Sequence, residues 1–284
     1  MDASELVLNE RGGIYHIDVK PGELATRIIT VGDPMRGKMI AHYFDKIHFS
    51  RSHREFTAVT GEFSGQLLSV ISTGIGTDNI DIVLSEIDAV FNIDLQSKLE
   101  KTQKTTLQFI RLGTSGALHP DIQVGDIVLS KYSVGLDNLL DFYSIPSGSR
   151  LSALEEQVTD KISYPCYAFS GHQTMIEHFE TIGKKGITFS CPGFYGPQGR
   201  SLRIPPKNTH FLRGLQSINY EGVIATNFEM ETSAIYGLSS LMGHKAVSIS
   251  TILANRIHGN FSRQPEKEVQ QMIEKALENI TGLN

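Results

Sequence analysis

The 284-residue sequence has no tryptophan and two cysteines, Cys166 and Cys191. These two cysteines have neither the C-x-x-C spacing of a metal or redox site nor the density of a disulfide scaffold, which favours a reducing compartment. The chain also lacks a strong excess of either charge, since 26 Lys and Arg stand against 31 Asp and Glu. The net charge of −5 therefore gives no indication of a nucleic-acid or membrane surface.

Long hydrophobic runs are absent as well. No apolar stretch approaches the roughly 20 residues of a membrane-spanning helix, and the N-terminal segment has no apolar core of a secretory signal. We therefore expect a cytoplasmic protein. Hydrophobic residues still make up 40% of the chain, so residues 1–284 have enough apolar surface for one large α/β domain.

Short β-rich runs alternate with amphipathic helical patterns, which predicts a β-sheet with helices on its faces. One predicted helix follows Asp78, and the last begins at Pro265 and ends by Gly282. The segments 96–106 and 144–163 are polar and lack clear periodicity, so we expect surface excursions there. The predicted strands cover residues 25–31, 67–72, 107–112, 126–130, 186–190, 222–226 and 246–253.

Three predicted turns at strand ends combine glycine with arginine or hydroxyl side chains, at residues 31–36, 72–77 and 111–116. In open α/β sheets ligands bind outside the carboxyl ends of strands, where arginine and hydroxyl donors can hold an oxyanion such as phosphate. Each turn alone also has a simpler explanation. A strand-to-helix turn needs glycine for its geometry, and Arg36 or Arg111 could pair with a structural carboxylate.

The loop at residues 194–200, with the sequence FYGPQGR, carries a carboxamide at Gln198 and a guanidinium at Arg200. An amide offers a donor and an acceptor and a guanidinium offers donors, so together they could read a planar heterocycle whose carbonyls flank an N–H group. A uracil ring has such an edge. Taken alone, the loop is more simply a polar surface turn, because glycine and proline are common turn residues.

The stretch from Asn227 to Glu231 follows a predicted strand and opens a helical pattern. A carboxylate here could accept hydrogen bonds from vicinal ribose hydroxyls, with Met230 against the sugar ring. Alternatively, acidic residues in a first helical turn complement the helix macrodipole. In helical geometry residues two apart point in different directions, so Glu229 and Glu231 would not both face one ligand.

Together these motifs resemble the nucleoside phosphorylase family, and within it the members that act on uridine. The resemblance extends from about His16 to Arg256 and implies a central mixed β-sheet flanked by helices. It also implies a homo-oligomer, a dimer or a hexamer built of dimers, in which a neighbouring subunit completes each active site. The matching motifs are Gly32-Asp33-Pro34 with Arg36, Ser52-His53-Arg54-Glu55-Phe56, Ser72-Thr73-Gly74-Ile75-Gly76, Arg111 to Gly116, Phe194-Tyr195 with Gln198 and Arg200, and Phe228-Glu229-Met230-Glu231.

The resemblance also implies roles for individual residues. Two of them, Arg54 at the phosphate and His16 at the ribose 5′-hydroxyl, would come from the partner chain; the sequence alone would leave both as ordinary surface residues. Arg111, Gln198 and Arg200 would be the catalytic residues. The implied phosphate site comprises Gly32, Arg36, Arg54, Arg111 and Thr114; the ribose site His16, Thr114, Glu229, Met230 and Glu231; and the base site Phe194, Gln198 and Arg200.

The implied activity is the reversible phosphorolysis of uridine to uracil and ribose 1-phosphate, in pyrimidine salvage. Purine-specific relatives carry an aspartate in the segment that here spans residues 251–256, and this segment has none. The alternatives are a phosphorylase of deoxyuridine, thymidine or a purine nucleoside, a nucleosidase of the same fold, and a non-catalytic nucleoside-binding protein. Three arginines, Arg36, Arg54 and Arg111, argue against the nucleosidase, because water needs no anion site.

We expect no metal or other cofactor, with phosphate as a co-substrate. No H-E-x-x-H motif is present and the histidines are scattered. Some bacterial relatives bind a monovalent cation at a subunit interface through a glutamate like Glu55 and a serine after Gly76. Asn79 lies near that serine position here, so the cation pattern is incomplete. The segment 144–163 is longer than the family pattern and is expected to be a surface insertion.

Overall fold

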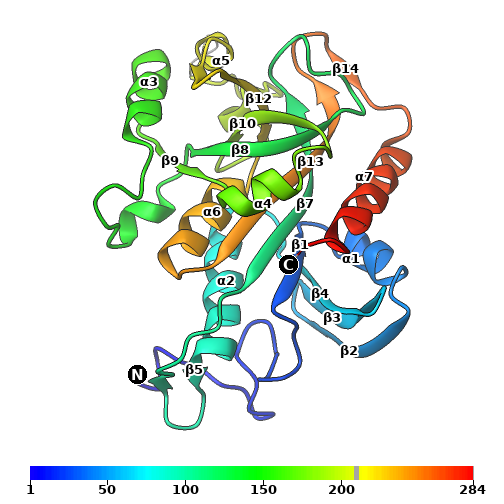
Figure 1. The fold of residues 1–284 in the computed structure, drawn as a ribbon. Coiled ribbons are helices and arrows are strands. Elements are labelled where there is room, and N and C mark those ends of the chain that lie inside the picture. The colour runs from blue at the N-terminus through cyan, green and yellow to red at the C-terminus, as the bar shows by residue number, and fades with distance from the viewer. Residues whose placement is uncertain (208–210, 284) are drawn as a thin grey trace.

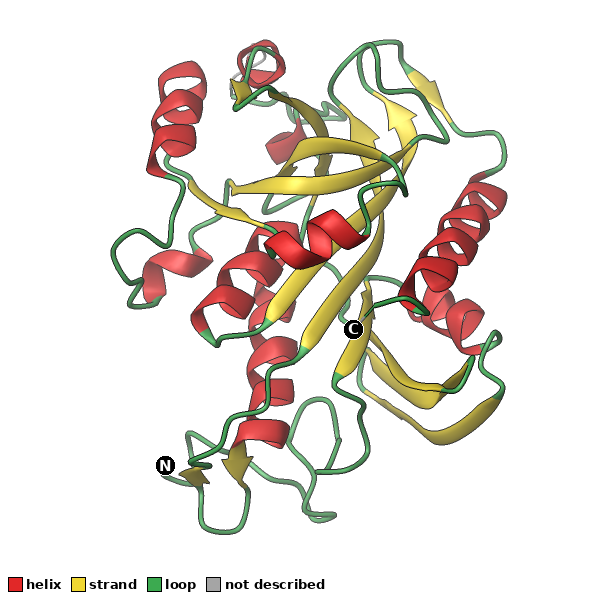
Figure 2. Ribbon diagram, viewed as in Figure 1, coloured by secondary structure: helices red, strands yellow, loops and turns green. Residues whose placement is uncertain are grey.

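The computed structural model describes residues 1–207 and 211–283. Strands and helices alternate along most of the chain (Figures 1 and 2). The strands are β1 (Arg27–Val31), β2 (Lys46–His53), β3 (Phe56–Phe63), β4 (Gln66–Ser72), β5 (Ile93–Asp94), β6 (Leu99–Glu100), β7 (Gln108–Ala117), β8 (Ile127–Gly135), β9 (Tyr167–Ser170), β10 (Lys184–Ser190), β11 (Asn219–Tyr220), β12 (Val223–Glu229), β13 (Lys245–Asn255) and β14 (Asn260–Phe261). The helices are α1 (Pro34–Ala41), α2 (Thr77–Asn92), α3 (Ser152–Ile162), α4 (Gln173–His178), α5 (Phe211–Gln216), α6 (Thr232–Leu241) and α7 (Pro265–Ile280), with 3-10 turns η1 (Leu139–Phe142) and η2 (Gly196–Gln198).

The central sheet is mixed and partly closed on itself. Its order is β11-β12-β10-β8-β13-β7-β1-β4-β3-β2. Strands β1, β4, β7 and β13 run parallel, as do β8, β10 and β12, whereas β8 and β13 are antiparallel. Two further pairs, Asn227 with Ala117 and Phe228 with Gly116, join β12 to β7. This extra pairing brings the end of β12 against the end of β7, where the predicted ligand residues lie.

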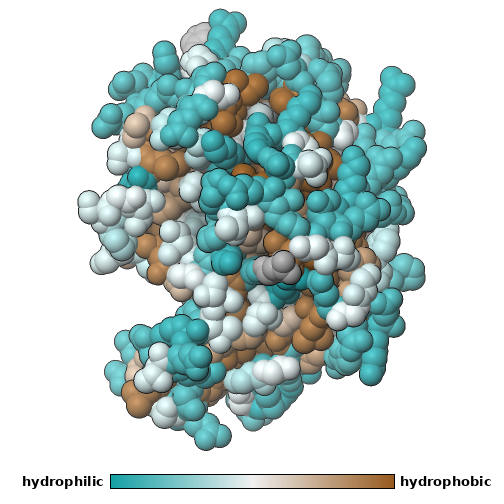
Figure 3. All heavy atoms as spheres, viewed as in Figure 1, coloured by the Kyte–Doolittle hydropathy of each residue, from teal (hydrophilic) through white to brown (hydrophobic). Residues whose placement is uncertain are grey.

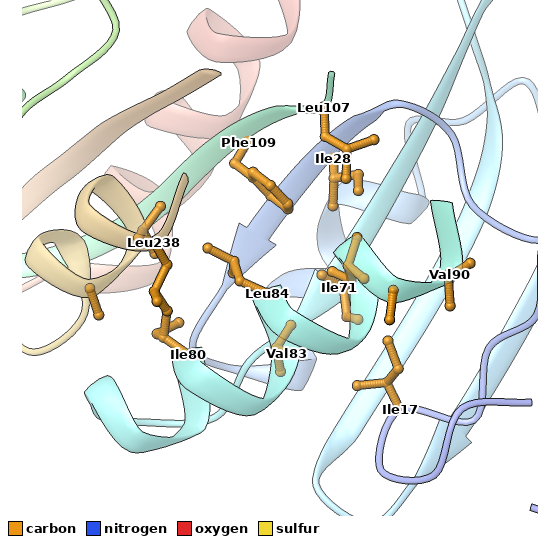
Figure 4. Packing of buried hydrophobic residues seen from close by; sticks show 14 of the residues in the cluster. Ile17, Ile28, Ile71, Ile80, Val83, Leu84, Val90, Leu107, Phe109 and Leu238 are labelled. Carbon is orange, nitrogen blue, oxygen red and sulfur yellow. The ribbon is translucent and has the colours of Figure 1, made fainter. Parts of the chain in front are cut away.

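Side chains alternate between two hydrophobic layers on either side of the sheet. Ile28 and Phe109 pack into the layer of α2 and α6, whereas their neighbours Ile29 and Ile110 pack into the layer of α1 and α7. Figure 4 shows Leu84 of α2 directed at the strands that carry Ile28 and Phe109. Because successive strand residues point to opposite faces, strands covered on both sides must be apolar at every position. The sheet is therefore a rigid support for the residues at its ends.

Most predicted elements are confirmed, including the final helix beginning at Pro265. Strands β2 and β3 were not predicted. In β2 all residues except Phe49 and His53 are exposed, so the strand has no alternating apolar pattern. The segment 144–163 also differs from expectation, because it contains α3. In that helix Leu154, Val158 and Ile162 form one narrow buried stripe among polar residues, which hides the helical period.

Hydrophobic residues are interspersed with hydrophilic ones on the face shown in Figure 3. Within residues 1–207 and 211–283, no helix combines the length and the apolar character needed to cross a membrane.

Candidate active site

A cavity of about 700 Å³ opens where β1, β10, β12 and β13 end and along the second half of β7. Of the twelve predicted site residues, two, His16 and Arg54, do not line it. The other ten all do: Gly32, Arg36, Arg111, Thr114, Phe194, Gln198, Arg200, Glu229, Met230 and Glu231. Segments almost 200 residues apart in sequence thus contribute to one cavity of the size that holds a small-molecule ligand.

Arg36 lies at one end of this cavity, in the first turn of α1. Asp33 caps the helix by accepting a hydrogen bond from the Met35 backbone N–H at 2.8 Å. The Arg36 guanidinium reaches the Leu112 carbonyl oxygen at 3.4 Å, and its buried Nε has no hydrogen-bond partner among the described residues. Burial, followed by the nearby Arg111, lowers the pKa of Arg36. Two guanidinium groups near a helix N-terminus form a site for an anion.

Arg111 is 5% exposed and lies within β7 rather than in a turn. The sequence predicted a strand ending at residue 112, but β7 continues to Ala117 because β13 pairs along its whole length. The Arg111 guanidinium folds back over Gly113, where a Cβ atom would lie 1.9 Å from Nη1. It donates hydrogen bonds to Glu231 Oε2 at 2.6 Å and to Ser250 Oγ at 3.1 Å.

Both glutamates of the predicted ribose site face Arg111, contrary to the expectation for a helix. The distance from Arg111 Nη2 is 2.9 Å to Glu229 and 2.6 Å to Glu231. Glu229 is the last residue of β12 and Glu231 precedes α6, with φ −138° and ψ −27°, so the backbone between them is not helical. Although burial opposes it, the two carboxylates raise the pKa of Arg111. For Glu231, burial acts in the other direction and raises the pKa of the carboxyl group.

Gln198, Arg200 and Phe194 form a compact unit at another part of the cavity. The Arg200 guanidinium lies 3.7 Å from the centre of the Phe194 ring, and its Nη1 donates to Gln198 Oε1 at 2.6 Å. Gln198 is 3% exposed, so this side chain is buried although Phe194 and Tyr195 of the same loop are about half exposed. Burial, followed by repulsion from Arg256, lowers the pKa of Arg200 to about 10, which leaves the side chain charged at neutral pH.

Arg256 is a cavity residue that the sequence analysis missed. It follows β13, and its Nη1 donates to the Gln198 carbonyl oxygen at 3.0 Å, while Nη2 lies 3.4 Å from the Gly199 carbonyl oxygen. The segment 251–256 was considered only for an aspartate. An arginine near the carboxyl end of a predicted strand was the available signal, as it was at Arg36 and Arg111. Arg256 supports the backbone of the loop that carries Gln198.

His16 and Arg54 lie together outside the cavity, in a surface group that we call the Tyr15 patch: Tyr15, His16, His53 and Arg54. The Arg54 guanidinium lies over the Tyr15 ring at 5.1 Å, and Tyr15 and His16 meet edge to face at 4.9 Å. His16 Nδ1 is 2.6 Å from Glu86 Oε1, and the His53 ring nitrogen bonds to the His16 carbonyl oxygen at 2.9 Å. One chain therefore does not bring these side chains to its own cavity.

A metal centre has no candidate ligands in the described part of the chain, where no group of three or more His, Cys, Asp or Glu residues is placed to hold an ion. The cavity instead offers cationic and amide donors beside two carboxylates. It can bind an anion at Arg36 and Arg111, hydroxyl groups at the glutamates, and a planar polar ring at the Gln198 loop.

The chain is similar to known nucleoside phosphorylases. A uridine phosphorylase of Thermococcus kodakarensis is 30% identical over 281 residues, which is 97% of this chain and 89% of that protein. A purine nucleoside phosphorylase of Geobacillus stearothermophilus is 28% identical, covering 93% of this chain and 97% of the relative. A Trypanosoma brucei nucleoside phosphorylase with uridine phosphorylase activity superposes with a TM-score of 0.86 at 28% identity, over 98% of this chain and all of that one.

The sequence model of the phosphorylase superfamily matches residues 26–283. This range includes every residue that lines the cavity. The chain belongs to the phosphorylase superfamily.

Proposed function

We propose that this protein is a uridine phosphorylase, which catalyses the reversible phosphorolysis of uridine to uracil and ribose 1-phosphate. One observation carries the proposal: a single cavity holds the Arg36 and Arg111 cations at one part and the Gln198–Arg200 pair at another. Arg36 has no ion pair with a carboxylate among the described residues, so its charge is available to phosphate. Two similar proteins with uridine phosphorylase names or activity support the choice of substrate.

The base pocket supports a pyrimidine over a purine. Gln198 and Arg200 line the cavity and carry hydrogen-bond donors, and a uracil ring carries two carbonyl acceptors. The segment 251–256 lines the cavity with Leu253, Ala254, Asn255 and Arg256 and has no carboxylic acid to protonate a purine. The Asn255 side chain is already engaged by backbone groups, including the Ile122 carbonyl oxygen at 2.7 Å.

In this mechanism the N-glycosidic bond lengthens, and negative charge develops on the departing uracil. Arg200 and the Gln198 amide stabilise that charge, and a well-placed donor of this kind contributes roughly 3 kcal/mol to the transition state. Arg36 and Arg111 hold phosphate near the anomeric carbon, which converts a two-body encounter into a positioned reaction. Because phosphate is the nucleophile, these side chains suffice without a covalent enzyme intermediate.

We further propose that the active form is a homo-oligomer, a dimer or a hexamer built of dimers, in which the partner's Tyr15 patch completes the cavity. The partner's Arg54 would contact phosphate and the partner's His16 the ribose 5′-hydroxyl. The positions of both side chains outside their own cavity support this arrangement. Such a site would need no bound cofactor and would operate in the cytoplasm on free nucleosides.

The test is uracil release from uridine with and without phosphate. We expect uracil and ribose 1-phosphate in equal amounts, and only with phosphate present. Equal release without phosphate would instead identify a nucleosidase, and faster release from inosine a purine enzyme. Uridine binding without turnover would identify a non-catalytic protein.

Variants of the base pocket test its role separately. We expect Gln198→Ala and Arg200→Ala each to lower kcat/KM for uridine by roughly a hundredfold. Arg203→Ala is the matched control, because Arg203 is an exposed arginine of the same region. Losses below a few-fold in both pocket variants would reject base recognition by this loop.

A further inference from the structure

Asn255 lines the cavity, yet its side chain is fully hydrogen-bonded within the protein. It is the last residue of β13 and is 2% exposed. Nδ2 donates to the Ile122 carbonyl oxygen at 2.7 Å and to the His119 carbonyl oxygen at 3.2 Å. Oδ1 accepts from the backbone N–H groups of Ile257 and His258, both at 2.8 Å. A carboxamide has two donors and two acceptor lone pairs, so Asn255 keeps none for a ligand.

The four hydrogen bonds of Asn255 join two loops at the end of the cavity. The carbonyl acceptors belong to the connection between β7 and β8, residues 118–126, and the N–H donors to the turn between β13 and β14. The network fixes which way the amide points, since only the NH2 group can donate to carbonyl oxygens. An aspartate has nearly the same shape, but its ionised carboxylate has no proton to donate to them.

Arg256 is the residue whose position depends on this junction. Its backbone N–H donates to the Ala117 carbonyl oxygen at 3.1 Å, and its Nη1 donates to the Gln198 carbonyl oxygen at 3.0 Å. The guanidinium stands at the end of a long side chain, so it keeps this contact only if its own backbone is held in place. Asn255 holds that backbone, because its bonds to Ile257 and His258 close the turn around Arg256.

We propose that Asn255 is a positioning residue for the base pocket: it fastens the turn after β13 to the β7–β8 connection and so holds Arg256 against the loop that carries Gln198. Asn255 acts through Arg256 and does not touch the base. This role also limits specificity, because an aspartate at this position would lose both donor bonds before its acid could protonate a purine. Replacing the asparagine therefore does not convert the pocket. This proposal rests on the proposed uridine phosphorolysis.

The test compares Asn255→Asp, Asn255→Ala, Arg256→Ala and the double variant N255A/R256A. We expect each of them to lower kcat/KM for uridine by about 10- to 100-fold, the usual effect of a small misplacement in a site, with the phosphate KM within about threefold of the parent value. Asn255→Asp should release no more hypoxanthine from inosine than the parent protein. Asn219→Asp is the matched control, because it makes the same exchange at an exposed asparagine outside the cavity.

The double variant separates positioning from an independent contribution to stability or binding. It should match Arg256→Ala within about threefold, because Asn255 has nothing to position once that side chain is gone. Losses that multiply in the double variant would overturn the proposal. So would a loss that disappears when kcat/KM is expressed per folded protein, with the folded fraction taken from urea unfolding.

Purine turnover and nucleoside binding complete the test. Inosine phosphorolysis by Asn255→Asp at least tenfold faster than by the parent would overturn the limit on specificity. If Asn255→Asp does not fold, Asn255→Ala and the double variant carry the test, since neither buries a new charge. A parent protein that releases no uracil would reject the proposed function. Uridine affinities of the same variants, measured by calorimetry, would still decide whether Asn255 acts through Arg256.

Discussion

At the scale of single residues, the anion site depends on a glycine that touches no ligand. Gly113 provides the space in which the Arg111 guanidinium folds back toward Glu229 and Glu231. Its φ is not in the left-handed region, so its backbone conformation suits any residue. The requirement is steric, because the guanidinium occupies the volume of a side chain.

We expect Gly113→Ala to raise the phosphate KM by about 10- to 100-fold, the effect of losing one charge-assisted hydrogen bond. The new Cβ would lie 1.9 Å from Arg111 Nη1 and must displace it. Steady-state kinetics with varied phosphate measures the effect. Gly282→Ala is the control, since its Cβ would meet neighbours at ordinary contact distances of 3.5 Å or more. An unchanged phosphate KM in Gly113→Ala would contradict a role for Arg111 in this pose.

The sequence predicted which residues belong to the candidate site better than it predicted which of their side chains contact one another. Arg36, Arg111, Gln198 and Arg200 were all predicted, because arginine and amide groups beside glycine are distinctive. The contact of Arg111 with both glutamates was not predicted, since it depends on the irregular backbone before α6. Such pairings depend on tertiary geometry, and local patterns do not contain it.

At the scale of elements, α3 shows why a helix can be missed in a polar segment. Leu154, Val158 and Ile162 recur every four residues and are buried against α5 and the sheet, while most other positions face solvent. When only one residue per turn is apolar, the helical periodicity of hydrophobic residues is weak and is easily missed in the sequence. Strand β2 was not predicted for a related reason. It is held by backbone hydrogen bonds to β3, and its side chains are largely exposed, so its sequence carries no apolar pattern.

We expect Leu154→Ala to lower the free energy of unfolding by about 2–5 kcal/mol, the usual cost of a cavity at a fully buried leucine. Leu154 belongs to the hydrophobic cluster that also contains Phe189 and Phe228. Urea unfolding measures the change, and Glu156→Ala on the exposed side of α3 should stay within about 0.5 kcal/mol of the parent. A cost below 1 kcal/mol for Leu154→Ala would show that α3 does not share this core.

At the scale of the whole molecule, closure of the sheet explains why distant segments meet at one cavity. The pairing of β12 with β7 places Glu229 and Glu231 beside Arg111. Alternating strands and helices predicted the class of fold, but not this antiparallel contact, which joins segments more than 100 residues apart. The Tyr15 patch remains outside the cavity of its own chain, so the proposed roles of His16 and Arg54 require a second copy.

The proposed exchange of residues between subunits predicts complementation between two inactive variants. An Arg54→Ala chain keeps an intact cavity, and an Arg200→Ala chain keeps an intact Tyr15 patch. In a mixed dimer the cavity of the Arg54→Ala chain receives the intact Tyr15 patch of the Arg200→Ala chain. One of the two sites in that dimer therefore has no substitution. Random pairing after co-expression at equal amounts should therefore restore about a quarter of the parent uridine phosphorolysis. The control is co-expression of Arg54→Ala with His16→Ala, which gives every cavity a defective patch and should restore nothing. Activity equal to the mean of the separate variants in both mixtures would place all contributing residues in one chain.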